Sequence, residues 1–107
     1  MTERIFLCGP SGCGKTATAR NLMVEGDVLF TNEKELALVR ARPGSIVYFE
    51  TNLGADHWST KGRVYCTYFD KIYHWTSTDP ADAPTVISKT RPEDREKWLS
   101  FWGIATQ

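Results

Sequence analysis

Eight residues near the amino end limit the fold of this chain more than any other feature of its sequence. They match G-x-x-x-x-G-K-[ST] at every fixed position and are Gly9, Pro10, Ser11, Gly12, Cys13, Gly14, Lys15 and Thr16. Glycines allow the backbone to turn its amides inward around phosphate oxygens, and a helix that follows adds the positive end of its dipole. The pattern predicts a strand, a phosphate-binding loop and a helix, in that order.

Two side chains of this segment have predicted roles toward a nucleoside triphosphate. Lys15 is expected to reach the β- and γ-phosphates and to assist catalysis, and the Thr16 hydroxyl is expected to bind Mg²⁺. The other loop residues are candidate nucleotide-binding residues through their backbone. The expected cofactor is Mg²⁺ with ATP or another nucleoside triphosphate. The N-K-x-D signature for guanine is absent, so ATP is preferred only by default.

Apolar runs alternate with helix signals around and after this loop. Strands are expected at residues 4–8, 27–31 and 45–50, and helices at 15–24 and 32–42. Each of the three runs is apolar at nearly every position, so both faces of each strand should be buried. Such strands separated by helices are typical of a parallel α/β sheet.

The second half of the chain predicts a different arrangement. Two β-rich segments, 63–69 and 71–76, flank Asp70 and favour an antiparallel hairpin. A last strand is expected at 85–89, and a capping-box start predicts a C-terminal helix over 92–102. Without repeats or linkers, the 107 residues are expected to form one domain, 1–107. The expected fold is thus α/β, with a short, mainly parallel sheet, a β-hairpin after the third strand and a C-terminal helix.

Hydrolysis at such a loop requires an acid at the end of a neighbouring strand, and two acids qualify. Glu50 ends the apolar run 46–49, and Asp70 ends the run 64–69. A strand that follows two strand–helix units tends to lie beside the first strand, so Glu50 is the preferred catalytic and metal-binding acid. Asp70 is the alternative, although its place between two β-rich segments favours a turn. The residue directly after Glu50 is Thr51, at a position where phosphate-binding-loop enzymes often have a second acid.

Composition and charge indicate the compartment and the partners that are expected for this chain. Thirteen basic and thirteen acidic residues leave no net charge to attract nucleic acid or anionic membrane. No apolar run approaches the roughly 20 residues of a membrane span, and residues 1–4 lack the features of a secretory signal. Three cysteines without a C-x-x-C pair are typical of reduced thiols. A cytoplasmic protein without a membrane partner is expected.

The order of these motifs resembles the superfamily 3 helicase domain of replication initiators from small circular single-stranded DNA viruses. The glycine-rich loop is followed by 27–44, by the acid-tipped segment 45–50, by Lys61-Gly62-Arg63-Val64, and by 84–88 before the charged segment 91–94. The resemblance covers most of the chain, and its most specific motif is the loop. It implies nucleotide hydrolysis coupled to a conformational or assembly step, single-stranded DNA as a partner, a homo-oligomer, and a nuclear location where the protein is viral.

Other interpretations stay open at this point. A nucleotide or small-molecule kinase shares the loop, and so does a nucleotide-binding module that does not hydrolyse. Lys61 and Arg63 could contact nucleic acid, but a solvated turn is favoured. Arg91 and Arg95 could reach the γ-phosphate of a neighbouring subunit, but surface ion pairs are favoured.

Overall fold

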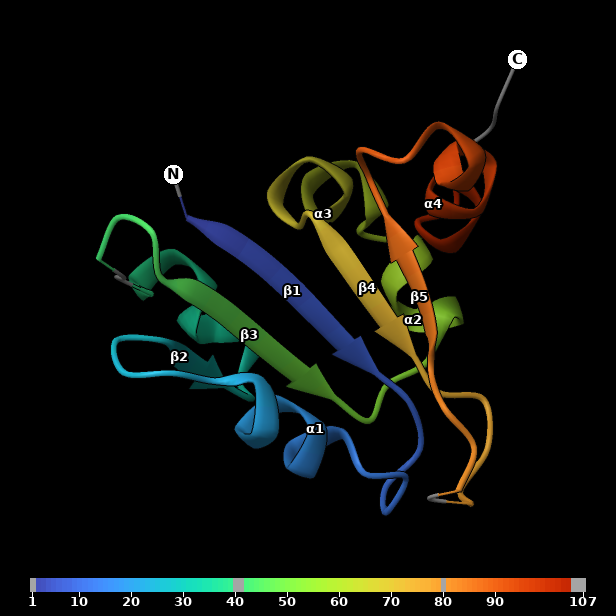
Figure 1. Cartoon of the computed structure of the whole chain (residues 1–107). Coiled ribbons are helices and arrows are strands. Elements are labelled where there is room, and N and C mark those ends of the chain that lie inside the picture. Colours follow the sequence, from blue (N-terminus) through green and yellow to red (C-terminus); the bar gives the residue numbers. More distant parts are fainter. Residues whose placement is uncertain (1, 40–41, 80, 105–107) are drawn as a thin grey trace.

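The computed structural model describes residues 2–39, 42–79 and 81–104. Five strands form one sheet in the order β2-β3-β1-β4-β5 (Figure 1). The first four strands are parallel, and β5 is antiparallel to β4. The strands are β1 (Glu3–Cys8), β2 (Val28–Phe30), β3 (Ile46–Thr51), β4 (Lys71–His74) and β5 (Thr85–Ser88). The expected α/β fold with a mainly parallel sheet is confirmed.

Helices cover both faces of the sheet (Figure 1). Helix α1 (Lys15–Leu22) packs on one face through Ala19, and the other helices pack on the opposite face. These are the 3₁₀ helix η1 (Glu33–Leu38), α2 (Ala55–Ser59), α3 (Gly62–Tyr68), the 3₁₀ turn η2 (Pro92–Asp94) and α4 (Arg95–Phe101). None of the helices in the described ranges has the length and apolar character that crossing a membrane requires.

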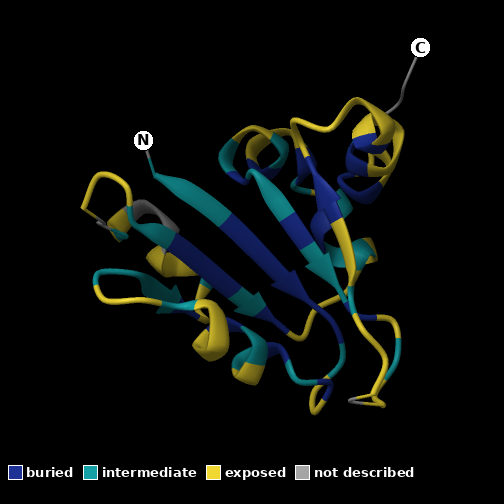
Figure 2. Ribbon diagram, viewed as in Figure 1, coloured by how far each residue is buried: buried dark blue, intermediate teal, exposed yellow. Residues whose placement is uncertain are grey.

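Strand β1 lies at the centre of the sheet, between β3 and β4. Its apolar side chains alternate between the faces: Ile5 and Leu7 join the cluster under α1, while Phe6 and Cys8 join the cluster on the other face. All four are buried, as Figure 2 shows for the central strands. Since Leu7 of β1 lies opposite Glu50 of β3, the expectation that the third strand lies beside the first is confirmed.

The larger core cluster is aromatic and lies between the sheet and helices α2, α3 and α4. The ring of Phe6 is surrounded by five other rings, with centroids 5.0–5.9 Å away. Trp98 and Trp102 of the last helical turns belong to this cluster and are buried. Burial of rings of this size contributes several kcal/mol to stability.

The expected hairpin over 63–69 and 71–76 is wrong, because residues 62–68 form helix α3. Parallel strands β3 and β4 require the chain to return from the carboxyl edge to the amino edge of the sheet, and α2 and α3 make that return. Tyr65 and Phe69, four residues apart, then point into the same core. The β-rich composition of the segment is overridden by this packing.

A close contact with the end of α4 determines where α3 begins. A Cβ built on Gly62 would lie 1.7 Å from the carbonyl oxygen of Trp102, so only glycine allows the start of α3 to approach the end of α4 this closely. The antiparallel pair of the fold is β4 with β5 instead, joined by a connection of ten residues, 75–84.

The segment expected to form a helix over 32–42 forms a shorter 3₁₀ helix, η1. The Asn32 side chain accepts a hydrogen bond from the Lys34 amide at 2.9 Å, as a helix cap does, but Val39 is already extended. Residues 40 and 41 lie outside the described ranges. The first helix also ends earlier than expected, at Leu22.

Candidate functional site

The glycine loop, residues 9–16, begins where β1 ends and is held by both neighbouring strands. The Gly9 amide donates to the carbonyl of Thr51 at 3.3 Å, and the Trp75 amide donates to the carbonyl of Cys8 at 2.8 Å. A Cβ on Gly9 would lie 2.6 Å from the Cβ of Trp75, so the close approach of these two segments requires glycine. The loop therefore starts from a fixed position at the carboxyl edge of the sheet.

The loop backbone adopts angles that only glycine adopts readily. Gly12 has φ of +84° and Gly14 has φ of +101°. After Gly9, the next amide along the described chain that donates to a backbone carbonyl is that of Thr18, which bonds Gly14 at 2.9 Å. The intervening amides at the start of α1 thus have no backbone acceptor and can donate to a bound group. Together with the helix dipole, they suit an anion.

Lys15 lies inside the loop, although a lysine at a loop–helix junction would ordinarily extend into solvent. Its ammonium donates to the carbonyls of Gly9 and Pro10, both at 2.8 Å, and lies 3.7 Å from the sulfur of Cys13. The residue is only 3% exposed. The positive charge is consequently held at the base of the loop, where phosphate oxygens could replace the carbonyls as acceptors.

Thr16 and Glu50 come together from two different elements. The Thr16 hydroxyl, in the first turn of α1, donates to Oε1 of Glu50, near the end of β3, at 2.6 Å. Both side chains are half-buried. Hydroxyl and carboxylate oxygens are ligands that Mg²⁺ prefers, so the pair fits this ion.

Thr16 and Glu50 alone would supply only part of the ligands of such an ion. Among the described residues, no group of three or more His, Cys, Asp or Glu side chains is arranged to hold a metal. Mg²⁺ usually keeps several waters and binds substrate phosphates with one or two protein groups. The pair of Thr16 and Glu50 is thus suited to Mg²⁺ that arrives with a nucleotide.

Asp70 lies at the opposite, amino edge of the sheet, immediately before β4. Its Oδ2 accepts the Arg4 amide at 2.9 Å, and its Oδ1 pairs with Lys89 at 3.3 Å. The structure therefore brings Glu50, and not Asp70, beside Thr16.

The thiol of Cys8 beside the loop is not a reactive group. Burial raises the pKa of Cys8 to about 11, although the charge of Lys15 lowers it in part. The protonated thiol donates to the Leu53 carbonyl at 3.1 Å. A thiol that stays protonated at neutral pH is a poor nucleophile, because the thiolate is the reactive form.

Trp75 and Thr51 contribute to the site through contacts that no sequence pattern predicted. Trp75 is buried in the cluster with Cys13 and Ala19 under the loop. The Thr51 hydroxyl accepts the Leu53 amide at 3.1 Å and shapes the turn after β3. Only the strand order places β3 and β4 on either side of β1, so no local signal could have identified these residues.

Two of the other basic candidates, Lys61 and Arg91, are engaged elsewhere. Lys61 bonds Glu33 at 2.7 Å, and the hydrogen bonds that Glu33 accepts from Lys61 and Tyr65 lower the pKa of its carboxyl. The segment from Lys61 to Val64 is the start of α3, not a hairpin loop. Arg91 pairs with Asp94 at 2.7 Å, so the favoured ion pair is present.

Comparisons with protein-family models, with curated proteins and with solved structures found no match to this chain.

Proposed function

We propose that this protein binds a nucleoside triphosphate with Mg²⁺ at the glycine loop and hydrolyses it. The contact between the Thr16 hydroxyl and the Glu50 carboxylate, at 2.6 Å, is the observation that carries the proposal. It joins the last position of the loop motif to an acid on the neighbouring parallel strand. This combination is the one that hydrolysis at a phosphate-binding loop requires.

In this proposal, each residue of the site has a distinct role. The free amides at the start of α1 and the Lys15 ammonium bind the phosphates. Thr16 and Glu50 hold Mg²⁺, which supplies positive charge against the phosphate oxygens. Glu50 also orients the water that attacks the terminal phosphate.

A second candidate is a nucleotide-binding module that does not hydrolyse, and Thr51 favours it. The residue after Glu50 is a threonine whose hydroxyl already accepts the Leu53 amide, so Glu50 is the one acidic residue within β3. One acid would then have to serve both the metal and the water.

We further propose that hydrolysis drives a conformational or assembly step on DNA, as the resemblance to superfamily 3 helicase domains implies. The segment from Lys61 to Val64 is helical and does not contribute to this argument. Support for this part of the proposal comes from the glycine loop and the acid-tipped strand β3 alone.

Thermal unfolding and calorimetry with nucleotides test the binding step. At 100 times the dissociation constant, Mg²⁺·ATP should stabilise the protein by about 2.7 kcal/mol, which is a shift of several degrees for a domain of this size. GTP and CTP tested in parallel identify the base, and chelation of Mg²⁺ is the control. Absence of a shift with all three nucleotides would contradict the proposal.

Phosphate release then separates the two candidates. Hydrolysis without a phosphate acceptor, faster in the presence of single-stranded DNA, supports the coupled enzyme. Tight binding without phosphate release supports the non-hydrolysing module.

A further inference from the structure

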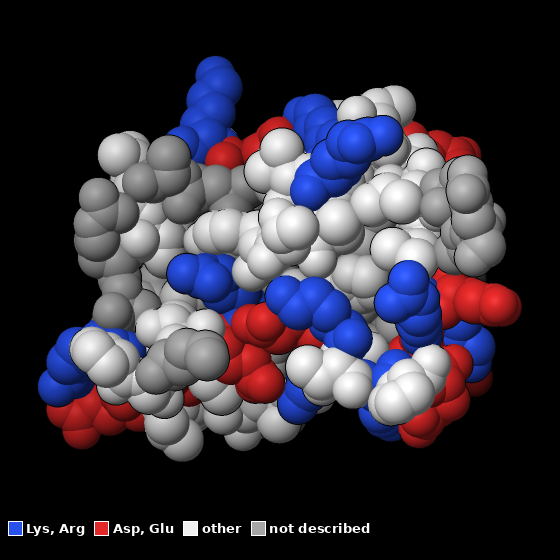
Figure 3. Space-filling model, turned by 90° about the horizontal axis from the view of Figure 1, so that it is seen from above, with Lys and Arg blue, Asp and Glu red and all other residues white. Residues whose placement is uncertain are grey.

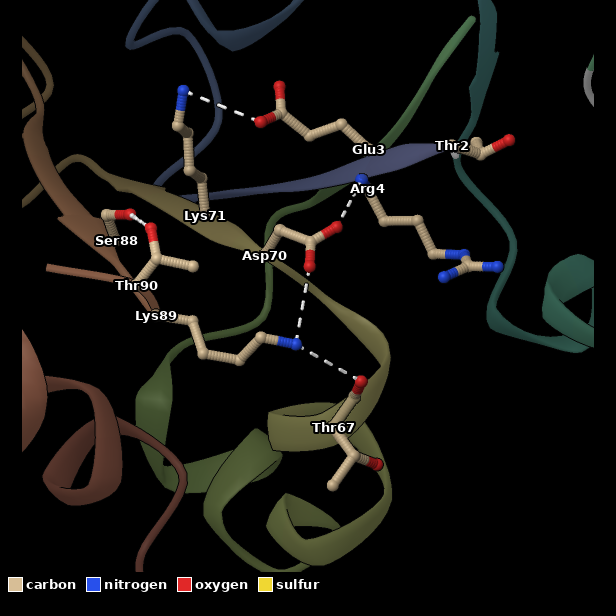
Figure 4. Close-up of a pocket in the computed structure, with 9 residues that line it drawn as sticks. All are labelled: Thr2, Glu3, Arg4, Thr67, Asp70, Lys71, Ser88, Lys89 and Thr90. Carbon is tan, nitrogen blue, oxygen red and sulfur yellow. Dashed lines mark hydrogen bonds and ion pairs between the residues drawn. The ribbon is translucent and has the colours of Figure 1, made fainter. Parts of the chain in front are cut away.

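A second polar site lies at the amino edge of the sheet, on the side of the molecule away from the glycine loop. It is a hollow of about 450 Å³ between the start of β1, the end of α3, and the residues around the β4–β5 pair (Figure 4). Figure 3 looks onto this edge and shows basic side chains beside acidic ones. None of its residues has a part in the proposed nucleotide chemistry.

The hollow carries an excess of positive charge. Three cations line it, Arg4, Lys71 and Lys89, against the two carboxylates of Glu3 and Asp70. Lys71 pairs with Glu3 at 3.6 Å, and Lys89 pairs with Asp70 at 3.3 Å. One positive charge is left without a carboxylate.

Arg4 carries that unbalanced charge. Its guanidinium lies over the ring of Tyr68, with the central carbon 4.5 Å from the ring centroid. In the part of the chain that the structure describes, the Arg4 side chain makes no hydrogen bond or ion pair. A stacked guanidinium with its donors free is pre-organised for an oxyanion.

Lys89 is held only loosely. Its contacts with Asp70 at 3.3 Å and with the Thr67 carbonyl at 3.4 Å are both longer than the 2.7–2.9 Å usual for charged pairs. The ends of both side chains lie by the last turn of α3, with Lys89 at the Thr67 carbonyl and Arg4 over the Tyr68 ring. In Figure 4 the Lys89 ammonium ends beside the Asp70 carboxylate, and the Arg4 side chain extends past it on the other side. The Thr90 hydroxyl lies in the same hollow, where it shares a hydrogen bond with Ser88.

We propose that this hollow binds a phosphate group through Arg4 and Lys89. The phosphate belongs either to the backbone of a nucleic-acid strand or to a free phosphate, because the two present the same oxygens. The site is independent of the nucleotide proposal, since it lies at the other edge of the sheet. The alternative role of both cations is to complement the carboxyl end of α3.

Residue-resolved amide NMR with two probes tests this proposal. Inorganic phosphate and a twelve-nucleotide oligothymidylate are titrated separately into the full chain. The expected response is a shift of the amides of residues 2–4, 67–71 and 88–90. Any phosphate bound at the glycine loop is seen separately, through residues 11–18.

Arg4→Gln and Lys89→Gln should each weaken binding at the amino edge by at least about threefold. Each should also lower the salt dependence of oligonucleotide binding, by about 0.7 in log–log slope for every phosphate that the variant no longer binds. Arg63→Gln is the matched control, because Arg63 is an exposed arginine of α3 outside the hollow. Its affinity at the amino edge should equal that of the unchanged protein.

Each outcome either supports or overturns the proposed phosphate site. Oligonucleotide shifts at the amino edge that both variants weaken assign the site to a strand backbone, and phosphate shifts alone assign it to a free anion. Absence of shifts there with both probes, or equal affinity in Lys89→Gln and the unchanged protein, overturns the proposal. Lys89→Gln carries the test if Arg4→Gln does not fold, since thermal unfolding should hardly change when such long contacts are removed.

Discussion

Glu50 and Asp70 have similar surroundings in the sequence, yet they lie at opposite edges of one sheet and have different partners. Each follows an apolar run and is flanked by a β-rich segment. Glu50 lies at the carboxyl edge and meets a hydroxyl from the first turn of a helix. Asp70 lies at the amino edge and ties the start of β1 to Lys89. The edge of the sheet at which each acid lies therefore determines whether its carboxylate faces the glycine loop or pairs with neighbouring elements.

The two edges also differ in how their polar groups are satisfied. At the carboxyl edge, amides at the start of α1 remain without backbone acceptors. At the amino edge, the carboxylates of Glu3 and Asp70 lie within ion pairs that connect neighbouring elements. Ligands of open parallel sheets bind outside the carboxyl ends of the strands, which is the edge where these backbone amides lie.

The largest expected difference between the edges is in nucleotide affinity. Lys15→Ala should weaken Mg²⁺·ATP binding by about 100-fold or more, because the variant lacks the ammonium at the base of the loop. Calorimetry measures the affinity. Lys89→Ala removes the same charge at the amino edge and should leave it unchanged.

Because Lys15 is buried and bonded to two carbonyls, the variant must also be shown to fold. Circular dichroism and thermal unfolding report this. A folded Lys15→Ala protein whose ATP affinity stays within threefold of the unchanged protein would contradict the assignment of the loop.

A smaller effect is expected for the hydroxyl that meets Glu50. Thr16→Val keeps the shape of the side chain and removes the metal ligand, so the gain in ATP affinity on adding Mg²⁺ should shrink by about tenfold. Thr67→Val, at the end of α3, is the matched control. An unchanged Mg²⁺ dependence in Thr16→Val would remove Thr16 from the site.

For Asp70, at the amino edge, the expected effect is on stability and not on nucleotide binding. Asp70→Asn keeps the size of the side chain but weakens its contacts with the Arg4 amide and Lys89. It should lower the free energy of unfolding by about 1 kcal/mol, as measured by urea denaturation. Nucleotide affinity should not change, and a decrease in affinity would show that the two edges are coupled.

The smallest expected effect concerns His74, at the carboxyl end of β4 beside the ring of Phe101. Burial lowers the pKa of His74 below its ordinary value of 6.5. The unfolded chain then binds more protons as the pH falls through 6.5, so stability should decrease there and level off below the folded pKa. Denaturation of His74→Gln should show a weaker pH dependence over this interval. Parallel curves for the two proteins would exclude His74 as the cause.

Much of the carboxyl edge could be predicted from the sequence, because it is built from consecutive segments. The loop motif, the apolar runs and the acid at position 50 lie within one strand–helix–strand–helix–strand stretch. The pairing of β1 with β3 follows from the ordinary connection of such units. Whether Thr16 and Glu50 bind Mg²⁺ stays a prediction.

The rest depends on contacts between distant segments. Tyr65, Tyr68 and Phe69 favour a strand by composition, whereas the helical form of α3 follows from packing against Trp102. The burial of Lys15 depends on the backbone path of the loop. The place of Trp75 depends on β4 lying beside β1. Local patterns contain none of this information.

The most direct test of the central claim compares phosphate release by Glu50→Gln and Asp70→Asn. Glu50→Gln keeps the shape of the side chain and removes the charge that orients the attacking water. ATP should therefore still bind, while turnover should fall by about 100-fold or more. Asp70→Asn should turn over at nearly the rate of the unchanged protein. Loss of turnover in Asp70→Asn with full activity in Glu50→Gln would contradict the assignment of the catalytic site to the carboxyl edge.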